Sequence, residues 1–217
     1  MRFFLDTANV ADIRRAAELG LADGVTTNPS LVSREKRDFE PLIQEICSIV
    51  SGPVSAEVTT EDLDEMLIQA RHLSSLAPNV VVKIPVGETG LRAVRILESE
   101  GVKTNVTLVF SALQALLVAR AGASFISPFI GRLDDIGHTG MDIVEDILDI
   151  LHVYSLESQV IVASIRHPLH VLQAARLGAH IATIPPAVLF KLLKHPLTDI
   201  GLRNFMNDWK KLEDLMK

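Results

Sequence analysis

The chain has 217 residues, 48% hydrophobic and 22% charged, which is typical of a globular protein with one large core. Its 21 basic and 27 acidic side chains give a formal net charge of −6, which argues against nucleic acid as the main partner. No apolar run is long enough to span a membrane, and the opening MRFFLDTAN reaches an acid and a turn too soon for a signal peptide. Because Cys47 is the single cysteine, an internal disulfide is excluded and we expect a reducing, cytoplasmic compartment.

Short apolar runs of strand length alternate along the chain with stretches that carry apolar residues at helical spacing. We expect strands at residues 3–5, 24–25, 54–58, 80–84, 102–108, 124–126, 160–163 and 180–184. We expect helices at residues 10–19, 39–50, 63–76, 91–97, 113–121, 141–154, 169–177 and 188–193. This alternation is typical of a parallel α/β protein.

The number of repeats distinguishes two α/β architectures. Eight repeats in 217 residues fit the compact end of the (β/α)8 or TIM-barrel range, so we predict a single barrel domain over residues 1–217. The alternative is a doubly wound open sheet, which usually has fewer strands, and the chain has no G-x-G-x-x-G fingerprint. Residues 198–217 predict one further amphipathic helix as a C-terminal extension. Helix ends are expected at Gly20, Gly101, Gly122 and Gly178.

Polar side chains stand at the carboxyl ends of seven of the eight predicted strands. In a barrel these ends meet at one mouth, where active sites lie. Buried polar groups are costly unless they are paired or used, and a whole ring of them is hard to explain by packing. We therefore interpret the ring as an active site, with the members Asp6, Thr27, Asn28, Glu57, Lys83, Asn105, Thr107, Ser127, Arg132, Ser164 and Arg166.

Lys83 is the most specific signal in this ring, because it is the only polar residue in the run VVVKIP at 80–85. A buried lysine loses part of its ammonium hydration, which favours the neutral, nucleophilic amine. Such an amine can form an imine with a ketone and so make the carbonyl carbon an electron sink for C–C cleavage. Asp6 and Glu57 enter the same mouth and could move the protons that this chemistry needs. The alternative is a structural lysine paired with an inward carboxylate.

Arg132, Ser164 and Arg166 predict an anion site on the later strands. Guanidinium groups pair with phosphate oxygens, and barrels often bind phosphate at the loops that follow their last strands. An alternative for Arg132 is a surface salt bridge to Asp134 or Asp135. We expect a phosphate-bearing ligand.

The remaining candidates for chemistry are weaker. The seven histidines show no metal-ligand spacing except His167 and His170, and the intervening Pro168 makes these a poor ligand pair. The segment GETG at 87–90 is too short for a P-loop and predicts a strand-to-helix turn. We expect neither a metal nor an organic cofactor.

The polar residues of the predicted mouth lie in motifs that cover nearly the whole chain in barrel order. The motifs are FLDTAN at 4–9, DGVTTNPSL at 23–31, SAEV at 55–58, VVKIP at 81–85, TNVTLVFS at 104–111, ISPFIGRLDDIG at 126–137, VASIRH at 162–167 and GAHIATIP at 178–185. Together these motifs resemble the small transaldolase and fructose-6-phosphate aldolase family, and most closely its transaldolase members.

The resemblance implies a class I aldolase mechanism with no metal, in which Lys83 forms the Schiff base. It implies that Asp6 handles the proton of the donor hydroxyl, and that Glu57 and Thr107 hold the water of imine chemistry. The implied substrate ligands are Asn28, Asn105 and Ser127 for donor hydroxyls, and Arg132, Ser164 and Arg166 for the phosphate.

Two reactions occur within the family, and they differ in the fate of the dihydroxyacetone unit. Aldolase members carry glutamine and tyrosine at the positions of Glu57 and Phe129, so the resemblance implies a transaldolase. It would move dihydroxyacetone between sugar phosphates of the pentose phosphate pathway. The alternative is a fructose-6-phosphate aldolase that releases free dihydroxyacetone, and a distant alternative is a non-catalytic sugar-phosphate-binding barrel. A tyrosine hydroxyl could reorient water for hydrolysis, whereas the Phe129 ring at the mouth offers no such proton path.

The predicted helix at 198–217 carries more apolar side chains than one stripe over its own barrel needs. Small family members form ring-based assemblies, often decamers. We therefore expect a homo-oligomer, either a decamer or a pentamer-based assembly. The alternative is a helix that folds back over its own barrel.

Overall fold

The computed structural model describes residues 1–216, and at its centre is a closed barrel of parallel strands. The strands follow one another around the barrel in chain order, and β1 pairs with β8 to close it. The predicted (β/α)8 barrel is therefore confirmed. The strands are β1 (Arg2–Asp6), β2 (Gly24–Thr26), β3 (Val54–Glu57), β4 (Val80–Pro85), β5 (Thr104–Val109), β6 (Phe125–Pro128), β7 (Gln159–Val162) and β8 (Ile181–Ile184).

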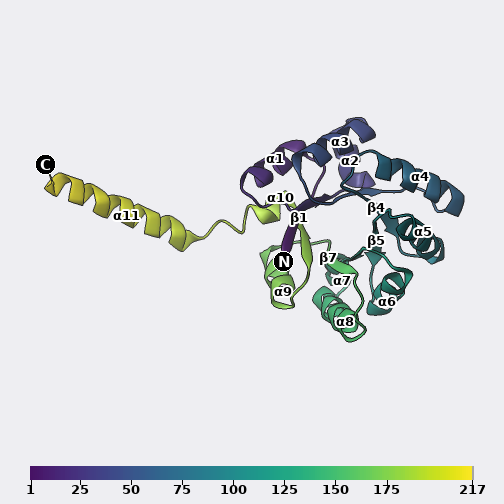
Figure 1. Cartoon of the computed structure of the whole chain (residues 1–217). Coiled ribbons are helices and arrows are strands. Elements are labelled where there is room, and N and C mark those ends of the chain that lie inside the picture. The colour runs from purple at the N-terminus through teal and green to yellow at the C-terminus, as the bar shows by residue number, and fades with distance from the viewer. Residues whose placement is uncertain (217) are drawn as a thin grey trace.

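Helices surround the barrel, as Figure 1 shows. Within residues 1–216, no helix combines the length and the hydropathy that a membrane crossing requires. The helices are α1 (Val10–Glu18), α2 (Pro29–Glu35), α3 (Phe39–Ile49), α4 (Leu63–Ser75), α5 (Glu88–Ser99), α6 (Ala112–Ala121), α7 (Ile130–Asp134), α8 (Gly140–Val153), α9 (Pro168–Arg176), α10 (Pro186–Leu189) and α11 (Pro196–Leu215).

Two short helices, α2 and α7, are not predicted by the sequence pattern. The signal for α2 is local: the Asn28 side-chain oxygen accepts a hydrogen bond from the Leu31 N–H at 2.9 Å, and Pro29 fills the first helical position. Helix α7 has no comparable signal, because Phe129 occupies its N-cap position without a side-chain hydrogen bond. Both helices follow a strand directly and shape the mouth of the barrel.

Other differences concern the ends of elements. The predicted strand-to-helix turn at 87–90 is too long, because Gly87 is the N-cap of α5 and Glu88 already lies in the helix. The predicted helix at 188–193 is too long, since α10 ends at Leu189. The C-terminal helix begins at Pro196 instead of Thr198, and Lys217, its predicted last residue, lies outside the described residues.

An apolar layer inside the barrel lies beneath the polar mouth. Phe4, Val81, Phe125, Ile161 and Ile181 form one buried cluster, separate from the larger core between strands and helices. Because side chains alternate along a strand, the residue two positions further on faces the same interior. Four members of the cluster are followed in this way by a polar residue, namely Asp6, Lys83, Ser127 and Thr183. The mouth therefore has an apolar floor.

Helix α11 extends away from the barrel, as Figure 1 shows at the yellow end of the chain. None of its residues is buried, and its aromatic side chains Phe205 and Trp209 are 74% and 58% exposed. The helix therefore does not fold back over its own barrel, and its apolar side is left without cover from this chain.

Candidate active site

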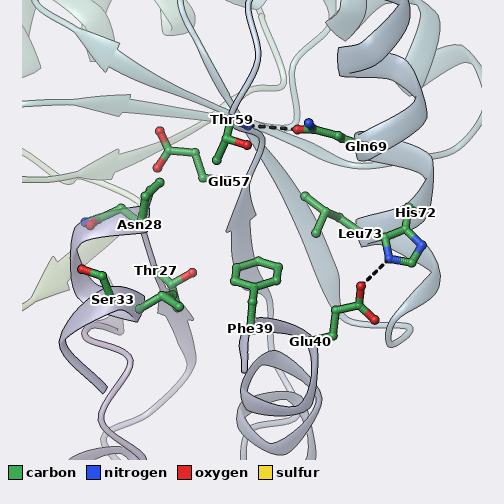
Figure 2. A pocket seen from close by; sticks show the side chains of 12 residues that line it. Thr27, Asn28, Ser33, Phe39, Glu40, Glu57, Thr59, Gln69, His72 and Leu73 are labelled. Carbon is green, nitrogen blue, oxygen red and sulfur yellow. Dashed lines mark hydrogen bonds and ion pairs between the residues drawn. The ribbon is translucent and has the colours of Figure 1, made fainter. Parts of the chain in front are cut away.

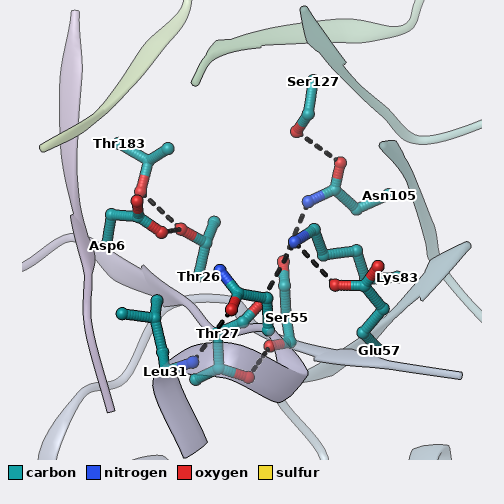
Figure 3. Close-up of polar contacts among 11 residues, drawn as sticks. Asp6, Thr26, Thr27, Leu31, Ser55, Glu57, Lys83, Asn105, Ser127 and Thr183 are labelled. Carbon is teal, nitrogen blue, oxygen red and sulfur yellow. Dashed lines mark hydrogen bonds and ion pairs between the residues drawn. The ribbon is translucent and has the colours of Figure 1, made fainter. Parts of the chain in front are cut away.

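The carboxyl ends of the strands bring the predicted polar residues together at one mouth. Glu57 of β3 lies in register with Lys83 of β4, and Lys83 with Asn105 of β5. In Figure 3 the side chains of Asp6, Lys83 and Ser127 approach the same space from different strands. The structure therefore places Asp6, Lys83 and Ser127 at one end of the barrel, and the roles predicted for them in an active site stay predictions.

Lys83 is held by one partner on the neighbouring strand β3 and one just after β2. Its side chain is 5% exposed, and Nζ donates hydrogen bonds to Glu57 Oε2 at 2.9 Å and to the Thr27 carbonyl oxygen at 3.1 Å. A buried ammonium that lost one of these partners would be left strongly destabilised. The arrangement places a nitrogen nucleophile and a proton acceptor in direct contact.

Asp6 is fixed by a relay of two threonines. Thr26 Oγ1 donates to Asp6 Oδ1 at 3.0 Å, and the Thr26 and Thr183 hydroxyl oxygens are 2.6 Å apart. Since Thr26 has one hydroxyl hydrogen, Thr183 is the donor in that second contact. Burial raises the pKa of Asp6 above its ordinary 3.8, against the opposing charge of Lys83 and the hydrogen bond from Thr26. A carboxyl group of this kind is suited to exchange a proton with a bound hydroxyl.

Asn105 stands at the centre of a second polar chain. Its amide nitrogen donates to Ser55 Oγ at 3.0 Å, and its oxygen accepts from Ser127 Oγ at 2.7 Å. All three residues are buried. Because these bonds fix the orientation of the amide, the chain presents ordered neutral polar groups to the mouth.

Thr107 is fully buried, and within the described residues 1–216 its hydroxyl has no hydrogen-bond partner. Strand β5 is irregular at this point, with a register shift between Val106 and Val109. Leu108 lies in the left-handed region with φ of 59°, a conformation that costs about 1–3 kcal/mol and is frequent at functional sites. A buried hydroxyl without a protein partner marks a place where a bound water or ligand can supply the bond.

A cavity of about 370 Å³ adjoins this constellation between α2, α3 and α4 (Figure 2). It shares Thr27, Asn28 and Glu57 with the mouth, and its walls include Phe39 and Leu73. The Asn28 side-chain oxygen is used to cap α2. If Asn28 contacts the substrate as predicted, its amide nitrogen is the group that remains for that contact. The cavity does not include Lys83 or the arginines among its lining residues.

The predicted anion-binding residues come from two segments that lie against each other, α7 and residues 163–166. Gly131 permits this contact: a Cβ at Gly131 would lie 2.1 Å from the Ser164 carbonyl oxygen and 2.8 Å from Arg166 Cγ. Ser164 itself has φ of 62°. The close approach places α7, which carries Arg132, against the segment that carries Ser164 and Arg166.

The two arginines of this group have different partners. Arg166 forms an ion pair with Asp135 at 3.0 Å, and both side chains are more than half exposed. The Arg132 guanidinium lies 5.2 Å from the centroid of the Phe129 ring. The acidic residues considered as partners for Arg132 are used elsewhere, since Asp135 pairs with Arg166 and Asp134 contacts a histidine of α9.

Three polar residues of the site are not among the sequence candidates. Thr26 and Thr183 hold Asp6, and Ser55 holds Asn105. Thr183 is the polar residue of the eighth strand, and its position between Ala182 and Ile184 is the signal that could have found it. With Thr183, all eight strands contribute a polar group near the mouth.

The part of the chain that the structure describes, residues 1–216, contains no cluster of three or more His, Cys, Asp or Glu that could hold a metal ion. His170, one of the two histidines considered in the sequence, contacts Asp134 at 3.0 Å.

Among solved structures, the fold is similar to a lactate oxidase from Pediococcus acidilactici, with a TM-score of 0.59 and 14% identity. The match covers 85% of this chain and 62% of that chain, so this chain spans less than two thirds of the oxidase. A likeness at this identity supports the barrel fold alone.

Comparison of sequences gives more specific information about the family than the similarity of fold does. The family described as Transaldolase/Fructose-6-phosphate aldolase matches residues 3–216. A protein of Desulforudis audaxviator named "Probable transaldolase" is 60% identical over 98% of this chain and 99% of its own. A protein of the same name from Lactiplantibacillus plantarum is 59% identical over 100% of this chain and 100% of its own. Another of the same name from Petrotoga mobilis is 57% identical over 100% of this chain and 98% of its own. The chain belongs to the transaldolase/fructose-6-phosphate aldolase family.

Proposed function

We propose that the protein is a transaldolase of the pentose phosphate pathway. It transfers a dihydroxyacetone unit from sedoheptulose 7-phosphate or fructose 6-phosphate to glyceraldehyde 3-phosphate or erythrose 4-phosphate. The observation that carries this proposal is the buried Lys83 amino group, 2.9 Å from Glu57 Oε2 in a polar mouth. Such a group is suited to imine formation with a ketone, and the names of the relatives agree with transfer.

In the proposed mechanism Lys83 attacks the ketone carbon of the donor, and the imine forms with loss of one water. Glu57 accepts a proton from the Lys83 nitrogen, and Glu57 and Thr107 hold the water. Asp6 then takes the proton of the C4 hydroxyl, so that the C3–C4 bond breaks and the aldose phosphate leaves. The bonding electrons pass to the imine, which becomes an enamine of dihydroxyacetone on Lys83. An acceptor aldehyde reverses these steps.

The remaining site residues are proposed to bind the sugar phosphate. Ordered amide and hydroxyl groups suit the donor hydroxyls, and two guanidinium groups suit the phosphate. The exposed ion pair between Arg166 and Asp135 is weak enough for a phosphate to compete with it. The assigned ligands are Asn28, Asn105 and Ser127 for hydroxyls, and Arg132, Ser164 and Arg166 for phosphate, with Phe129 beneath Arg132.

Borohydride trapping tests the Schiff base directly. The protein is treated with fructose 6-phosphate and sodium borohydride, and the adduct is located by peptide mass spectrometry. We expect the added mass on the peptide with Lys83, no adduct in Lys83→Met, and a normal adduct in Lys103→Met, which alters an exposed lysine just before β5. An adduct on a different lysine, or none in an active enzyme, would contradict the mechanism. Neither adduct nor turnover would indicate a non-catalytic barrel.

Phe129 and Glu57 are proposed to favour transfer over release. The Phe129 ring packs edge-on against Phe110, with centroids 6.0 Å apart, and brings no hydroxyl to the mouth. With fructose 6-phosphate alone we expect slow release of free dihydroxyacetone, and with added erythrose 4-phosphate rapid formation of sedoheptulose 7-phosphate. Phe129→Tyr should raise release and lower transfer. If release without an acceptor is as fast as transfer with one, the protein is an aldolase.

We further propose that the protein is a homo-oligomer, a decamer or a pentamer-based assembly, and that α11 packs on a second copy. The helix has no buried residue and carries apolar side chains such as Phe205, Trp209 and Leu215. An uncovered apolar helix is typical of a subunit contact. Light scattering of the full chain and of a version that ends at His195 tests this: the full chain should be an oligomer and the short version smaller. A monomeric full chain would refute the proposal.

The domain organisation and the compartment are proposed on simpler grounds. We propose that residues 1–217 form one domain, because among the described residues 1–216 the barrel leaves only α11 outside it. A cytoplasmic location is proposed from the cysteine content, since Cys47 is the single cysteine and is unpaired. Burial raises the pKa of the Cys47 thiol to about 11, which keeps it protonated and unreactive.

A further inference from the structure

His170 touches both segments that carry the proposed phosphate ligands. It is the third residue of α9 and is 5% exposed. Its Nδ1 accepts a hydrogen bond from the backbone N–H of Arg166 at 3.3 Å, and its Nε2 lies 3.0 Å from Asp134 Oδ2 in α7. A side chain at the third helical position that reaches back to an N–H before the helix resembles half of a capping box. Here the same ring also contacts a second segment.

One tautomer of the neutral ring makes both contacts, with a bare Nδ1 as acceptor and an Nε2–H that donates to Asp134. Burial lowers the pKa of His170, and the charges of His167 and Arg166 act in the same direction, while Asp134 opposes them. The rings of His167 and His170 are 3.7 Å apart between centroids. A protonated ring would lose the acceptor for the Arg166 N–H, so the contact depends on the neutral form.

The contacts continue from His170 into both arginine-bearing segments. Asp134 Oδ1 accepts from the Gly140 N–H at 2.8 Å, which ties α7 to the start of α8. Arg132 lies two residues before Asp134 in the same short helix. On the other side, the backbone group that His170 holds belongs to Arg166 itself. The ring therefore spans the distance between the two guanidinium-bearing segments.

We infer that His170 is a positioning residue of the phosphate subsite: its ring sets the separation between α7, with Arg132, and the segment with Ser164 and Arg166. The inference rests on the proposed function for the nature of the substrate, and on the contacts above for the geometry. Two guanidinium groups bind one phosphate well only when both are in place, and a misplacement of about 1 Å can cost about 100-fold. His170 has no contact with the reacting carbons in this scheme, so it acts through the arginines.

His170→Phe keeps a ring of similar size and removes both hydrogen bonds, while His170→Asn keeps an acceptor in place of Nδ1. His180→Phe is the matched control, because His180 Nδ1 also accepts a backbone N–H, that of Val160 at 3.1 Å, at the opposite end of the barrel. Three quantities are measured for each variant: KM for fructose 6-phosphate, inhibition by inorganic phosphate, and the rate of borohydride trapping of dihydroxyacetone, which has no phosphate.

We expect His170→Phe to raise KM for fructose 6-phosphate and to weaken phosphate inhibition, each by about 10- to 100-fold, with the trapping of dihydroxyacetone nearly unchanged. His170→Asn should recover part of the loss, and His180→Phe should change none of the three quantities. Equal losses with fructose 6-phosphate and dihydroxyacetone in His170→Phe, or unchanged phosphate inhibition, would overturn the inference. If His170→Phe does not fold, the same comparison in His170→Asn decides, with a smaller but selective loss expected.

The result also separates this inference from the proposed function. If the unaltered protein forms no adduct with either compound, the proposed function fails. The inference is then decided by the shift of the unfolding temperature that inorganic phosphate produces. A phosphate-induced shift that is present in the unaltered protein and lost in His170→Phe supports the inference. Equal shifts in the two proteins, or no shift in either, overturn the inference.

Discussion

The unpaired hydroxyl of Thr107 leads to a prediction in which stability and activity change differently. Thr107 is fully buried, and within residues 1–216 its Oγ1 has no hydrogen-bond partner. Replacement by valine exchanges this hydroxyl for a methyl group of similar size. Thr107→Val therefore removes a buried polar group that no protein atom satisfies, and it also removes the proposed contact to the water of imine chemistry.

The magnitudes follow from these two roles. An unsatisfied buried hydroxyl costs about 1–3 kcal/mol, and a bound water offsets part of that cost. We expect the free energy of unfolding of Thr107→Val to be unchanged or higher by about 1 kcal/mol. Loss of one positioned hydrogen bond at a reacting centre typically lowers the rate about 10²- to 10³-fold. The transfer rate should fall by that amount in a protein that is no less stable.

Thr104 offers a matched control on the same strand. It is also fully buried, but its Oγ1 donates to Glu98 Oε1 at 2.6 Å. Thr104→Val should lose about 1.5–3 kcal/mol of unfolding free energy, since the acceptor is charged, and keep its transfer rate. Urea unfolding and the rate of sedoheptulose 7-phosphate formation measure both quantities. Undiminished transfer in Thr107→Val would refute its proposed role, and a loss of stability as large as that of Thr104→Val would refute the claim of an unpaired hydroxyl.

Three further changes test other parts of the site. Because burial raises the pKa of Asp6 above 3.8, the folded state binds this proton more tightly than the unfolded chain, and stability falls as pH rises from 3.8 through the folded pKa. Asp6→Asn should therefore gain stability over the unaltered protein in urea titrations above pH 3.8, show little difference below it, and lose transfer. Arg132→Ala should weaken use of fructose 6-phosphate by about 2–4 kcal/mol in kcat/KM and leave dihydroxyacetone trapping nearly unchanged; equal losses would contradict the phosphate assignment. Gly131→Ala should force α7 away from Ser164, cost about 1–3 kcal/mol in urea unfolding and raise KM for fructose 6-phosphate; an unchanged KM would contradict the close contact.

The barrel itself is predictable because its strands are short apolar runs bounded by helices of regular spacing. Strand β4 shows this well, since VVVKIP is buried almost throughout, as a parallel strand should be. Helix α2 could also be predicted, because Asn28 and Pro29 form a known helix start. Asn28 also stands at a strand end, where a polar residue equally indicates a ligand. Helix α7 could not, because it has five residues and no side-chain cap.

The position of α11 could not be predicted from its own residues. An amphipathic helix needs an apolar surface, and the sequence does not say whether that surface belongs to the same chain or to another. Its apolar side chains, among them Phe205 and Trp209, are exposed in the structure. The choice depends on the direction that the segment between Leu189 and Pro196 takes in space, which is a tertiary property.

The ion-pair partners of the charged residues near the mouth could not be predicted from the sequence either. Asp134 and Asp135 are near Arg132 in the chain and are alternatives as its partners. Asp134 is two residues away and does not face Arg132 on a helix, and Asp135 is the C-cap of α7. The short helix α7 instead directs Asp134 toward α9 and Asp135 toward Arg166. Sequence could predict which residues gather at the mouth, because strand ends converge in any barrel. It could not predict which of them touch.

The contact between Lys83 and Glu57 bears on how the proposed reaction can begin. An ammonium group that donates to a carboxylate and a carbonyl has no lone pair, so the nitrogen must first lose a proton. The nearest acceptor is Glu57 Oε2, at 2.9 Å, and a transfer to it converts a buried ion pair into two neutral groups. The transfer needs no other base and no bulk water, because the two atoms are already in hydrogen-bond contact. Asp6 is then free for a different proton, that of the donor hydroxyl. The two carboxyl groups can therefore serve two successive steps, because only one of them is paired directly with the lysine.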